Sequence, residues 1–211
     1  MTVPATALAR IPSELSDAQA APMGCAGVTT YNALRHTKAL PGDRVAILGV
    51  GGLGHLGVQF SRAMGFETIA INRGTAKAED ARKLGAHHYI DATGDVAEAL
   101  KALGGVAVVL ATAGNSQAMA ATVGGLQPQG ELVTIGVTPE PLPVSPLQLI
   151  NPGLSIVGHP SGTAKEVEET MQFAVLSGVR AWIEELPLSQ AADGYAALEQ
   201  GRAHYRTVLT V

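Results

Sequence analysis

Cysteine is nearly absent from the sequence. Cys25 is the only one among 211 residues, which excludes a disulfide within the chain. Aromatic residues make up only 4% and charged residues only 15%, whereas hydrophobic residues make up 46%, which excludes a disordered chain. The core must therefore be built from Ala, Val, Leu and Ile. Together with 25 glycines, this composition favours helices packed closely on a parallel sheet over an antiparallel sandwich.

The sequence also lacks a cluster of basic residues. Fourteen Lys and Arg stand against eighteen Asp and Glu, which gives a net charge of −4 without a long run of either sign. Nucleic-acid phosphates require a clustered basic face, so we expect no nucleic-acid partner. No apolar stretch approaches the length of a membrane span, and the first residues lack the charged start and apolar run of a signal peptide. We expect a cytoplasmic protein with no membrane partner.

Apolar segments typical of strands alternate with segments of helical periodicity along most of the chain. The six strand segments run over residues 44–50, 68–72, 87–91, 106–113, 131–137 and 154–160. Their almost unbroken apolar runs are typical of strands buried on both faces of a sheet. The pattern predicts an α/β fold, a Rossmann doubly wound six-stranded parallel sheet with helices on both faces. Crossovers should be right-handed, and ligands should lie outside the carboxyl ends of the strands.

Helical segments fill the intervals and extend beyond the sheet. They run over residues 25–40, 51–64, 75–85, 95–105, 116–126 and 163–178, and Ser16 is placed to cap a short helix near the start of the chain. A proline-rich loop over residues 138–149 leads to the sixth strand. From about Val179 the alternation breaks, and we expect a strand over 181–187, a helix over 189–200 and a last strand over 204–211.

A glycine motif joins the first strand to the helix that follows it. Gly49, Gly51 and Gly54 form the pattern G-x-G-x-x-G, with Gly52 and Leu53 between the last two. In such a turn the first glycine permits a tight bend, the second lets the backbone approach a pyrophosphate, and the third lets helix and strand pack closely. The helix N-terminus offers N–H groups and a positive dipole end to phosphates. The motif predicts that these five residues bind a dinucleotide.

Two other interpretations of the glycine motif are weaker. The glycines could form a plain strand-to-helix turn that binds nothing. A Rossmann-type methyltransferase would usually carry an acidic residue just before its first glycine and another at the end of the second strand. The sequence has Leu48 and Asn72 at these places.

The second strand ends in Asn72-Arg73, with Lys77 close behind. An NAD-binding fold normally places a carboxylate at this strand end, where it accepts a hydrogen bond from the ribose 2′-hydroxyl. Here no carboxylate is present, and Arg73 and Lys77 can instead pair with a 2′-phosphate. The cofactor we expect is therefore NADP, with NAD as the other possibility. The alternative is that both cations are solvated charges at the start of a helix.

Four stretches match one family, in order along nearly the whole chain. They are residues 22–35, 41–65, 83–93 and 205–211. They resemble the zinc-dependent alcohol dehydrogenases of the medium-chain dehydrogenase/reductase superfamily, and in particular its microbial branch that acts on primary alcohols and aldehydes, often with NADP(H). The resemblance implies an enzyme that transfers a hydride between a primary alcohol and a nicotinamide.

The resemblance assigns a role to the lone cysteine. In the family, a Cys-Ala-Gly-x-Thr segment supplies a ligand of the catalytic zinc, and Cys25 is the matching position. Zinc held by sulfur and imidazole with one open position acts as a Lewis acid on the alcohol oxygen. Without the family, a lone cysteine is more often a small buried apolar residue. The residues that flank Cys25 match the family segment, and this favours the role of zinc ligand for Cys25.

Further site residues are implied by the same resemblance. Thr29 matches the threonine beside the nicotinamide end of the cofactor. Thr112, after the fourth strand, and Gly136 and Val137, after the fifth, lie at carboxyl ends of strands where the nicotinamide should rest. Arg206 matches an arginine that reaches back to the pyrophosphate, and the alternative for it is a solvated arginine on an edge strand.

The sequence departs from the family in its zinc ligands. The family also carries an N-terminal, mostly β domain with another zinc-ligating cysteine and a His-Glu pair, and commonly a four-cysteine loop for structural zinc. This sequence has one cysteine and no His-Glu dipeptide. We therefore interpret residues 1–24 as a remnant of the N-terminal catalytic domain, 25–178 as the Rossmann domain and 179–211 as a return segment of the catalytic domain.

Two functional hypotheses follow. The first is the NADP(H)-binding portion of a zinc-dependent alcohol or aldehyde oxidoreductase, inactive alone and unable to retain zinc. The second is a stand-alone NADP(H)-binding or sensing module without catalysis. A zinc-free quinone reductase of the same superfamily would have no use for Cys25. In related enzymes the edge of the sixth strand pairs across a dimer, so we expect a homo-oligomer that uses residues 154–160 and the loop before them.

Overall fold

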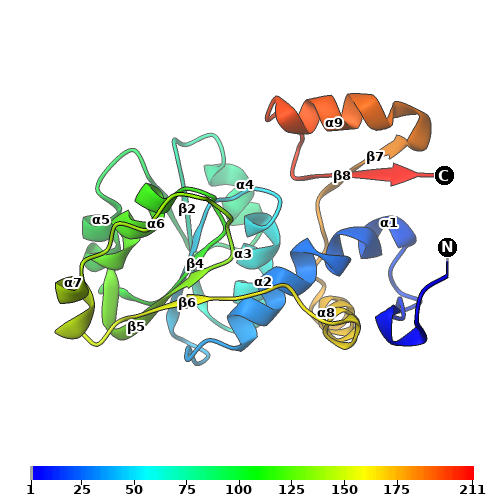
Figure 1. Ribbon diagram of the computed structural model, residues 1–211. Helices are drawn as coiled ribbons and strands as arrows, with labels where there is room; N and C mark the ends of the chain where they lie inside the picture. The colour runs from blue at the N-terminus through cyan, green and yellow to red at the C-terminus, as the bar shows by residue number, and fades with distance from the viewer. Residues whose placement is uncertain (1) are drawn as a thin grey trace.

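The computed structural model describes residues 2–211 and contains a six-stranded sheet in the order β3-β2-β1-β4-β5-β6 (Figure 1). All five pairings between neighbouring strands are parallel. The strands are β1 (Arg44–Leu48), β2 (Glu67–Asn72), β3 (His88–Asp91), β4 (Val106–Ala111), β5 (Leu126–Thr134) and β6 (Ser155–Gly158). The predicted doubly wound sheet is confirmed. The strand order reverses between β1 and β4, which is where such sheets open a crevice for a ligand.

Helices cover both faces of the sheet, as predicted. One face carries α2 (Ala26–Arg35), α3 (Gly54–Ala63), α4 (Ala78–Lys83) and α8 (Ala164–Ser177), and the other carries α5 (Val96–Ala102) and α6 (Ser116–Val123). Side chains of β1 point alternately to the two faces: Val45 and Ile47 join the first apolar cluster, Ala46 and Leu48 the second. This period of two, with apolar residues on both sides, explains why the strands read as continuous apolar runs.

Local signals set the ends of several helices. Ser16 caps α1 (Asp17–Ala20) by accepting a hydrogen bond from the Gln19 N–H at 3.2 Å, as expected. Two short 3-10 turns, η1 (Ala5–Ala7) and η2 (Ala21–Gly24), flank α1 in the sequence. At α8, Thr163 and Glu166 form a capping box, and Gly178 ends the helix at φ +75°.

The C-terminal residues form a unit beside the large sheet. It consists of β7 (Ile183–Pro187), η3 (Leu188–Gln190), α9 (Ala191–Glu199) and β8 (Arg206–Thr210), and β7 and β8 pair as a separate parallel ribbon. This is the expected strand, helix and strand. Figure 1 shows α9 and this ribbon at the same end of the molecule as α1, and α1 contacts both strands.

Several boundaries differ from the sequence prediction. α3 begins at Gly54 rather than Gly51, because residues 51–53 form the turn itself. β5 begins at Leu126 rather than Glu131, with an irregularity in its register against β4. The proline-rich loop contains a short helix, α7 (Pro146–Ile150), with a capping box between Ser145 and Gln148. Prolines suggested a loop throughout, but proline is well suited to the first turn of a helix.

The sixth strand is an edge of the large sheet, in the position expected for the proposed dimer contact. Val157 on this strand and Leu147 and Ile150 on α7 are exposed. Pairing of this edge with a second copy of the chain stays a prediction. Among residues 2–211, no helix is both long and apolar enough to cross a membrane.

Candidate functional site

The glycine motif forms the turn between β1 and α3. Gly49 has a φ of +93°, a conformation that favours glycine. A Cβ on Gly54 would lie 1.7 Å from the Gly49 carbonyl oxygen, so the helix can pack this closely on the strand only without a side chain. By contrast, a Cβ on Gly51 would meet no atom within 4 Å. Gly51 therefore borders open space in front of the turn, where a phosphate group could approach the backbone.

A cleft of about 440 Å³ opens in front of this turn. It is lined by the turn itself, by the end of β2 and the start of α4, by the residues that follow β4, and by the C-terminal unit: Gly49, Val50, Gly51, Gly52, Leu53, Asn72, Lys77, Thr112, Ala113, Leu198, Tyr205 and Arg206. Eight of these twelve residues belong to the predicted cofactor set, since only Val50, Ala113, Leu198 and Tyr205 were not singled out from the sequence. The tertiary fold thus brings most of the set to one place.

Arg206 reaches the glycine turn from β8. Its Nε donates a hydrogen bond to the Gly52 carbonyl oxygen at 2.9 Å. A Cβ on Gly52 would lie 2.8 Å from this Nε, so the absence of a side chain at Gly52 makes room for the arginine. Burial lowers the pKa of the guanidinium, and the nearby Cys25 partly opposes this effect. A half-buried cation beside a helix N-terminus is suited to binding a pyrophosphate.

The end of β2 carries the residues expected to contact the adenosine. Asn72 Oδ1 accepts a hydrogen bond from the Val50 N–H at 3.1 Å, so its side chain is tied to the glycine turn. Lys77 lines the cleft, whereas Arg73 is exposed and does not line it. The Arg73 guanidinium makes no hydrogen bond to any residue in the described part of the chain, which leaves it free to turn toward a ligand.

Tyr205 joins the C-terminal unit to this end of the cleft, and sequence reasoning missed it. Its hydroxyl donates to Asp80 Oδ2 at 2.6 Å, and the Lys77 Nζ lies 4.1 Å from its ring centroid. The hydroxyl holds the pKa of the Asp80 carboxyl below its usual range, and burial raises the pKa of Tyr205. No local pattern could have found this contact, because Asp80 and Tyr205 are 125 residues apart.

His55 makes a second connection between the glycine turn and the C-terminal unit. The side chain is fully buried. Its Nδ1 donates to the Gly51 carbonyl oxygen at 3.2 Å, and its Nε2 accepts from the Trp182 N–H at 3.2 Å. Burial lowers the pKa of His55 from 6.5 to about 4. The imidazole is therefore neutral near pH 7 and has no nitrogen left for a metal.

Thr112, Gly136 and Val137 lie at the carboxyl ends of β4 and β5. The Thr112 hydroxyl is 3.0 Å from the Leu48 carbonyl oxygen and 2.9 Å from that of Gly49, so it supports the glycine turn. A Cβ on Gly136 would lie 2.4 Å from the Ala113 carbonyl oxygen, and Val137 is 90% exposed. Gly136 and Val137 do not line the cleft, and contact between them and a nicotinamide stays a prediction.

Cys25 and Thr29 lie at the start of α2. Cys25 is exposed, and the Thr29 hydroxyl donates to the Cys25 carbonyl oxygen at 2.7 Å. The Thr29 hydroxyl is also 3.0 Å from the hydroxyl of Ser161, a residue that sequence reasoning did not single out. Ser161 follows β6, so the expected nicotinamide end of the site combines α2 with the segment after the sixth strand.

The described residues do not form a complete zinc site. Within residues 2–211, no group of three or more His, Cys, Asp or Glu side chains gathers as a catalytic zinc would require. A catalytic zinc needs three protein ligands, and Cys25 alone cannot close a tetrahedral site. We therefore derive no catalytic step through zinc for this chain.

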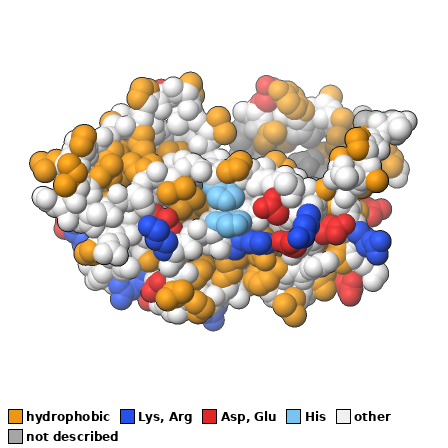
Figure 2. All heavy atoms as spheres, turned by 60° about the horizontal axis from the view of Figure 1, so that its bottom comes forward, with side chains coloured by type: hydrophobic (Ala, Val, Ile, Leu, Met, Phe, Trp, Pro, Cys, Tyr) orange, Lys and Arg blue, Asp and Glu red, His pale blue; other side chains and the backbone are white. Residues whose placement is uncertain are grey.

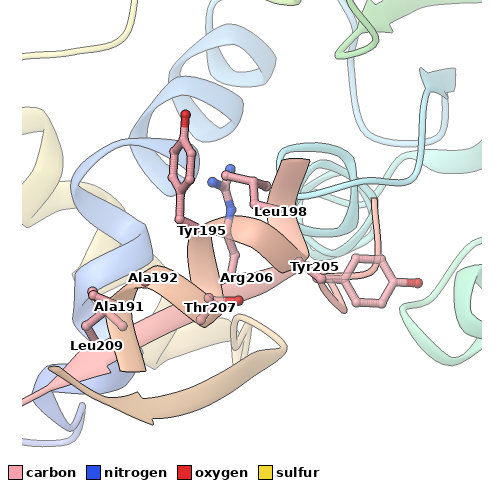
Figure 3. A pocket seen from close by; sticks show the side chains of 10 residues that line it. Ala191, Ala192, Tyr195, Leu198, Tyr205, Arg206, Thr207 and Leu209 are labelled. Atoms are coloured by element: carbon pink, nitrogen blue, oxygen red, sulfur yellow. The ribbon is translucent and has the colours of Figure 1, made fainter. Parts of the chain in front are cut away.

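A larger and more apolar cavity, of about 570 Å³, lies between α9 and β8 (Figure 3). It is next to the cleft. Tyr195 and Leu198 on α9 are each 63% exposed at its border, and it shares Leu198, Tyr205 and Arg206 with the cleft. It contains neither the glycine turn nor the carboxyl ends of the sheet strands, so the smaller cleft is the candidate cofactor site.

Comparison with known proteins places these features in a family. The chain is 40% identical over 206 residues to the alcohol dehydrogenase patD of Penicillium expansum, covering 97% of this chain and 60% of the relative. It is 37% identical to an alcohol dehydrogenase of Geobacillus stearothermophilus, covering 96% of this chain and 60% of the relative. The chain thus spans about 60% of the length of these relatives.

Solved structures agree with this assignment. The alcohol dehydrogenase of Aeropyrum pernix superimposes with a TM-score of 0.84 at 30% identity, covering 95% of this chain and 61% of that one. Residues 52–175, more than half of the chain, match the family described as zinc-binding dehydrogenase. The chain therefore belongs to the zinc-binding dehydrogenase family.

Proposed function

We propose that this chain is the NADP(H)-binding portion of a zinc-dependent oxidoreductase that transfers a hydride between a primary alcohol, or its aldehyde, and the nicotinamide. The observation that carries the proposal is the cleft at the place where the strand order of the sheet reverses, between β1 and β4. It combines a glycine turn open at Gly51 with the half-buried cation Arg206 and with Lys77, which follows a strand end that has no carboxylate. Its relatives are alcohol dehydrogenases.

The cofactor would lie along the cleft in the direction set by these residues. The N-terminus of α3 and Arg206 would hold the pyrophosphate, and Asn72, Arg73 and Lys77 would surround the adenosine ribose. Thr29, Thr112, Gly136 and Val137 would border the nicotinamide. When bound, the nicotinamide supplies the acceptor or donor of the hydride.

Replacement of the cations after β2 should reduce a preference for NADPH. A guanidinium paired with a phosphate forms a charge-assisted hydrogen bond worth about 1.5–3 kcal/mol. This corresponds to a roughly tenfold to hundredfold tighter binding of NADPH than of NADH. We expect Arg73→Ala to lose most of this ratio and Lys77→Ala to lose a smaller part. Fluorescence titration with the two reduced cofactors measures both dissociation constants.

Arg82→Ala is the matched control, because Arg82 is an exposed cation on α4 that does not line the cleft. It should leave the ratio of the two dissociation constants unchanged. Equal affinities for NADPH and NADH in the unaltered chain would refute the NADP assignment, and so would an unchanged ratio in Arg73→Ala.

The second candidate function is a nucleotide-binding module without chemistry of its own, serving as a sensor of NADP(H) or a subunit for a partner. The observation that favours it is the lack of a complete ligand set around Cys25 in the described residues. Both candidates predict cofactor binding. A gene that reads upstream of Met1 into a domain with a cysteine and a His-Glu pair would favour the enzyme.

The chain by itself should oxidise no alcohol. Without three ligands it should hold no tight zinc, and without a metal the alcohol oxygen is not polarised for loss of hydride. We expect less than one zinc per chain after dialysis against a chelator, and turnover of primary alcohols and aldehydes no higher than in a blank. One zinc retained per chain, or clear NADP(H)-dependent turnover, would contradict the interpretation of this chain as a catalytically incomplete fragment.

A further inference from the structure

Two histidines from distant parts of the sequence lie together on the surface, outside the cofactor cleft. His36 follows the last residue of α2, and His159 follows β6. Their ring centroids are 5.3 Å apart, and the ring planes differ by 24°. Figure 2 shows histidine side chains gathered at one place on the face that it presents. The cofactor proposal uses neither residue.

Backbone carbonyls fix the same tautomer in both rings. His36 Nδ1 lies 2.8 Å from the Asn32 carbonyl oxygen, and His159 Nδ1 lies 2.7 Å from that of Pro160. A carbonyl oxygen can only accept, so each neutral ring carries its proton on Nδ1 and keeps a lone pair on Nε2. This is the arrangement of metal-ligating histidines, which donate their other N–H to a carbonyl or carboxylate.

The separation of the rings suits a shared metal ion. Zinc binds imidazole nitrogen at roughly 2.0–2.1 Å in tetrahedral geometry, which places the centroids of two bound rings about 5 Å apart. We propose that His36 and His159 form a surface site for a zinc ion, with water as the remaining ligands. The site lies at the opposite end of α2 from Cys25, about 15 Å away by the rise of a ten-residue helix, and is independent of the proposed catalytic zinc and of cofactor binding.

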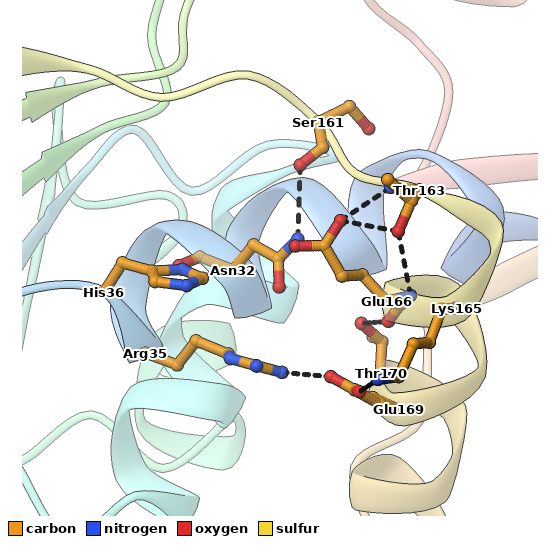
Figure 4. A network of polar contacts seen from close by, with 9 residues as sticks. All are labelled: Asn32, Arg35, His36, Ser161, Thr163, Lys165, Glu166, Glu169 and Thr170. Atoms are coloured by element: carbon orange, nitrogen blue, oxygen red, sulfur yellow. Dashed lines mark hydrogen bonds and ion pairs between the residues drawn. The ribbon is translucent and has the colours of Figure 1, made fainter.

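The surrounding charges do not oppose a cation at this place. The neighbouring cation Arg35 forms an ion pair with Glu169, which also lies 3.8 Å from Lys165 (Figure 4). Hydrogen bonds with Thr163 in the capping box of α8, and to a smaller extent the nearby His36, hold the pKa of the Glu166 carboxyl below its usual range. A zinc ion at this place would therefore lie near Arg35, whose charge is already balanced by Glu169, and near the carboxylate of Glu166.

A metal at this site would join α2 to the segment after β6. The two already touch through Asn32, whose Nδ2 donates to the Ser161 carbonyl oxygen at 3.3 Å (Figure 4). Asn32 is fully buried, and its Oδ1 has no hydrogen-bond partner among residues 2–211. Zinc that binds only the folded state would stabilise this contact, and the melting temperature should rise with the zinc concentration.

Titration of the chain with zinc chloride, followed by calorimetry and by thermal melting, tests the proposal. We expect one saturable zinc per chain, and this binding should persist in Cys25→Ser. His36→Gln and His159→Gln should each weaken it at least tenfold, which is about 1.4 kcal/mol. Magnesium should not bind, because it prefers oxygen ligands. With two protein ligands the ion is weakly held, so a chelator should remove it.

His87→Gln is the matched control, because Nδ1 of His87 accepts from the Thr68 N–H, which leaves the ring proton on Nε2 and no lone pair for a metal. It should bind zinc as the unaltered chain does. Circular dichroism checks that each variant is folded, and agreement between the two histidine variants guards against a local folding defect in either. Three results would overturn the proposal. They are a lack of saturable zinc binding, zinc binding that is retained in both His36→Gln and His159→Gln, and zinc binding that is lost in Cys25→Ser.

Discussion

Gly54→Ala should destabilise the folded chain by at least about 4 kcal/mol, in the range reserved for the most disruptive single substitutions. The added Cβ would lie 1.7 Å from the Gly49 carbonyl oxygen and 3.0 Å from Thr112 Oγ1. Neither neighbour can move easily: Gly49 belongs to the turn after β1, and its N–H donates to the Ile71 carbonyl oxygen at 2.8 Å. The helix would have to move off the sheet, at the expense of buried contacts of His55 and Leu56. Chemical denaturation measures the loss.

Gly51→Ala is the matched control on the same turn. A Cβ there meets no atom within 4 Å, so the free energy of unfolding should change by less than about 0.5 kcal/mol. The methyl group would occupy the space into which we place the pyrophosphate, and the affinity for NADPH should fall at least tenfold. A stable Gly54→Ala variant would contradict the packing argument. Full cofactor affinity in Gly51→Ala would contradict the position assigned to the pyrophosphate.

His55 should make the stability of the chain depend on pH. Burial lowers its pKa from 6.5 to about 4 in the folded state. The unfolded chain takes up the proton near the ordinary value, whereas the folded chain does so only near the lowered one. The contribution of neutral His55 is therefore fully present above about pH 6.5, declines as the pH falls, and is lost near pH 4. Between pH 7 and pH 5 the decline amounts to roughly 2 kcal/mol.

His55→Gln removes this titration and isolates its contribution. The variant should be less stable at pH 7, because glutamine cannot serve both the Gly51 carbonyl oxygen and the Trp182 N–H as the ring does. Its free energy of unfolding should, however, fall by about 2 kcal/mol less between pH 7 and pH 5 than that of the unaltered chain. Urea denaturation at both pH values measures the difference. Parallel losses in the two proteins would rule out His55 as the group responsible.

Much of the fold could be predicted because its signals are local. The apolar runs and the helical segments between them were sufficient to predict the parallel sheet, and the glycine spacing located the turn that the structure forms after β1. Errors arose where a local signal has two meanings. Prolines after β5 indicated a loop, yet Pro146 begins a short helix, and a glycine-rich turn before Gly54 was included in the helix that follows it.

The candidate site was predictable only in part. The glycines and the residues after β2 are found by their position relative to a strand, and Arg206 was found only by resemblance to a family. The structure adds Tyr205, His55 and Ser161, and these residues carry no motif. The sequence predicted the same role for Arg73 and Lys77, but in the structure Lys77 lines the cleft and Arg73 does not.

The sequence by itself thus determined the sheet, its covering helices and the glycine turn, because each depends on periodicity or spacing within a few dozen residues. Only the tertiary structure decided which side chains close the cleft and the surface site. The bonds of Tyr205 to Asp80, of Trp182 to His55 and of Thr29 to Ser161 join residues 125, 127 and 132 positions apart. Contacts over such separations depend on how whole elements pack, and no local pattern encodes them.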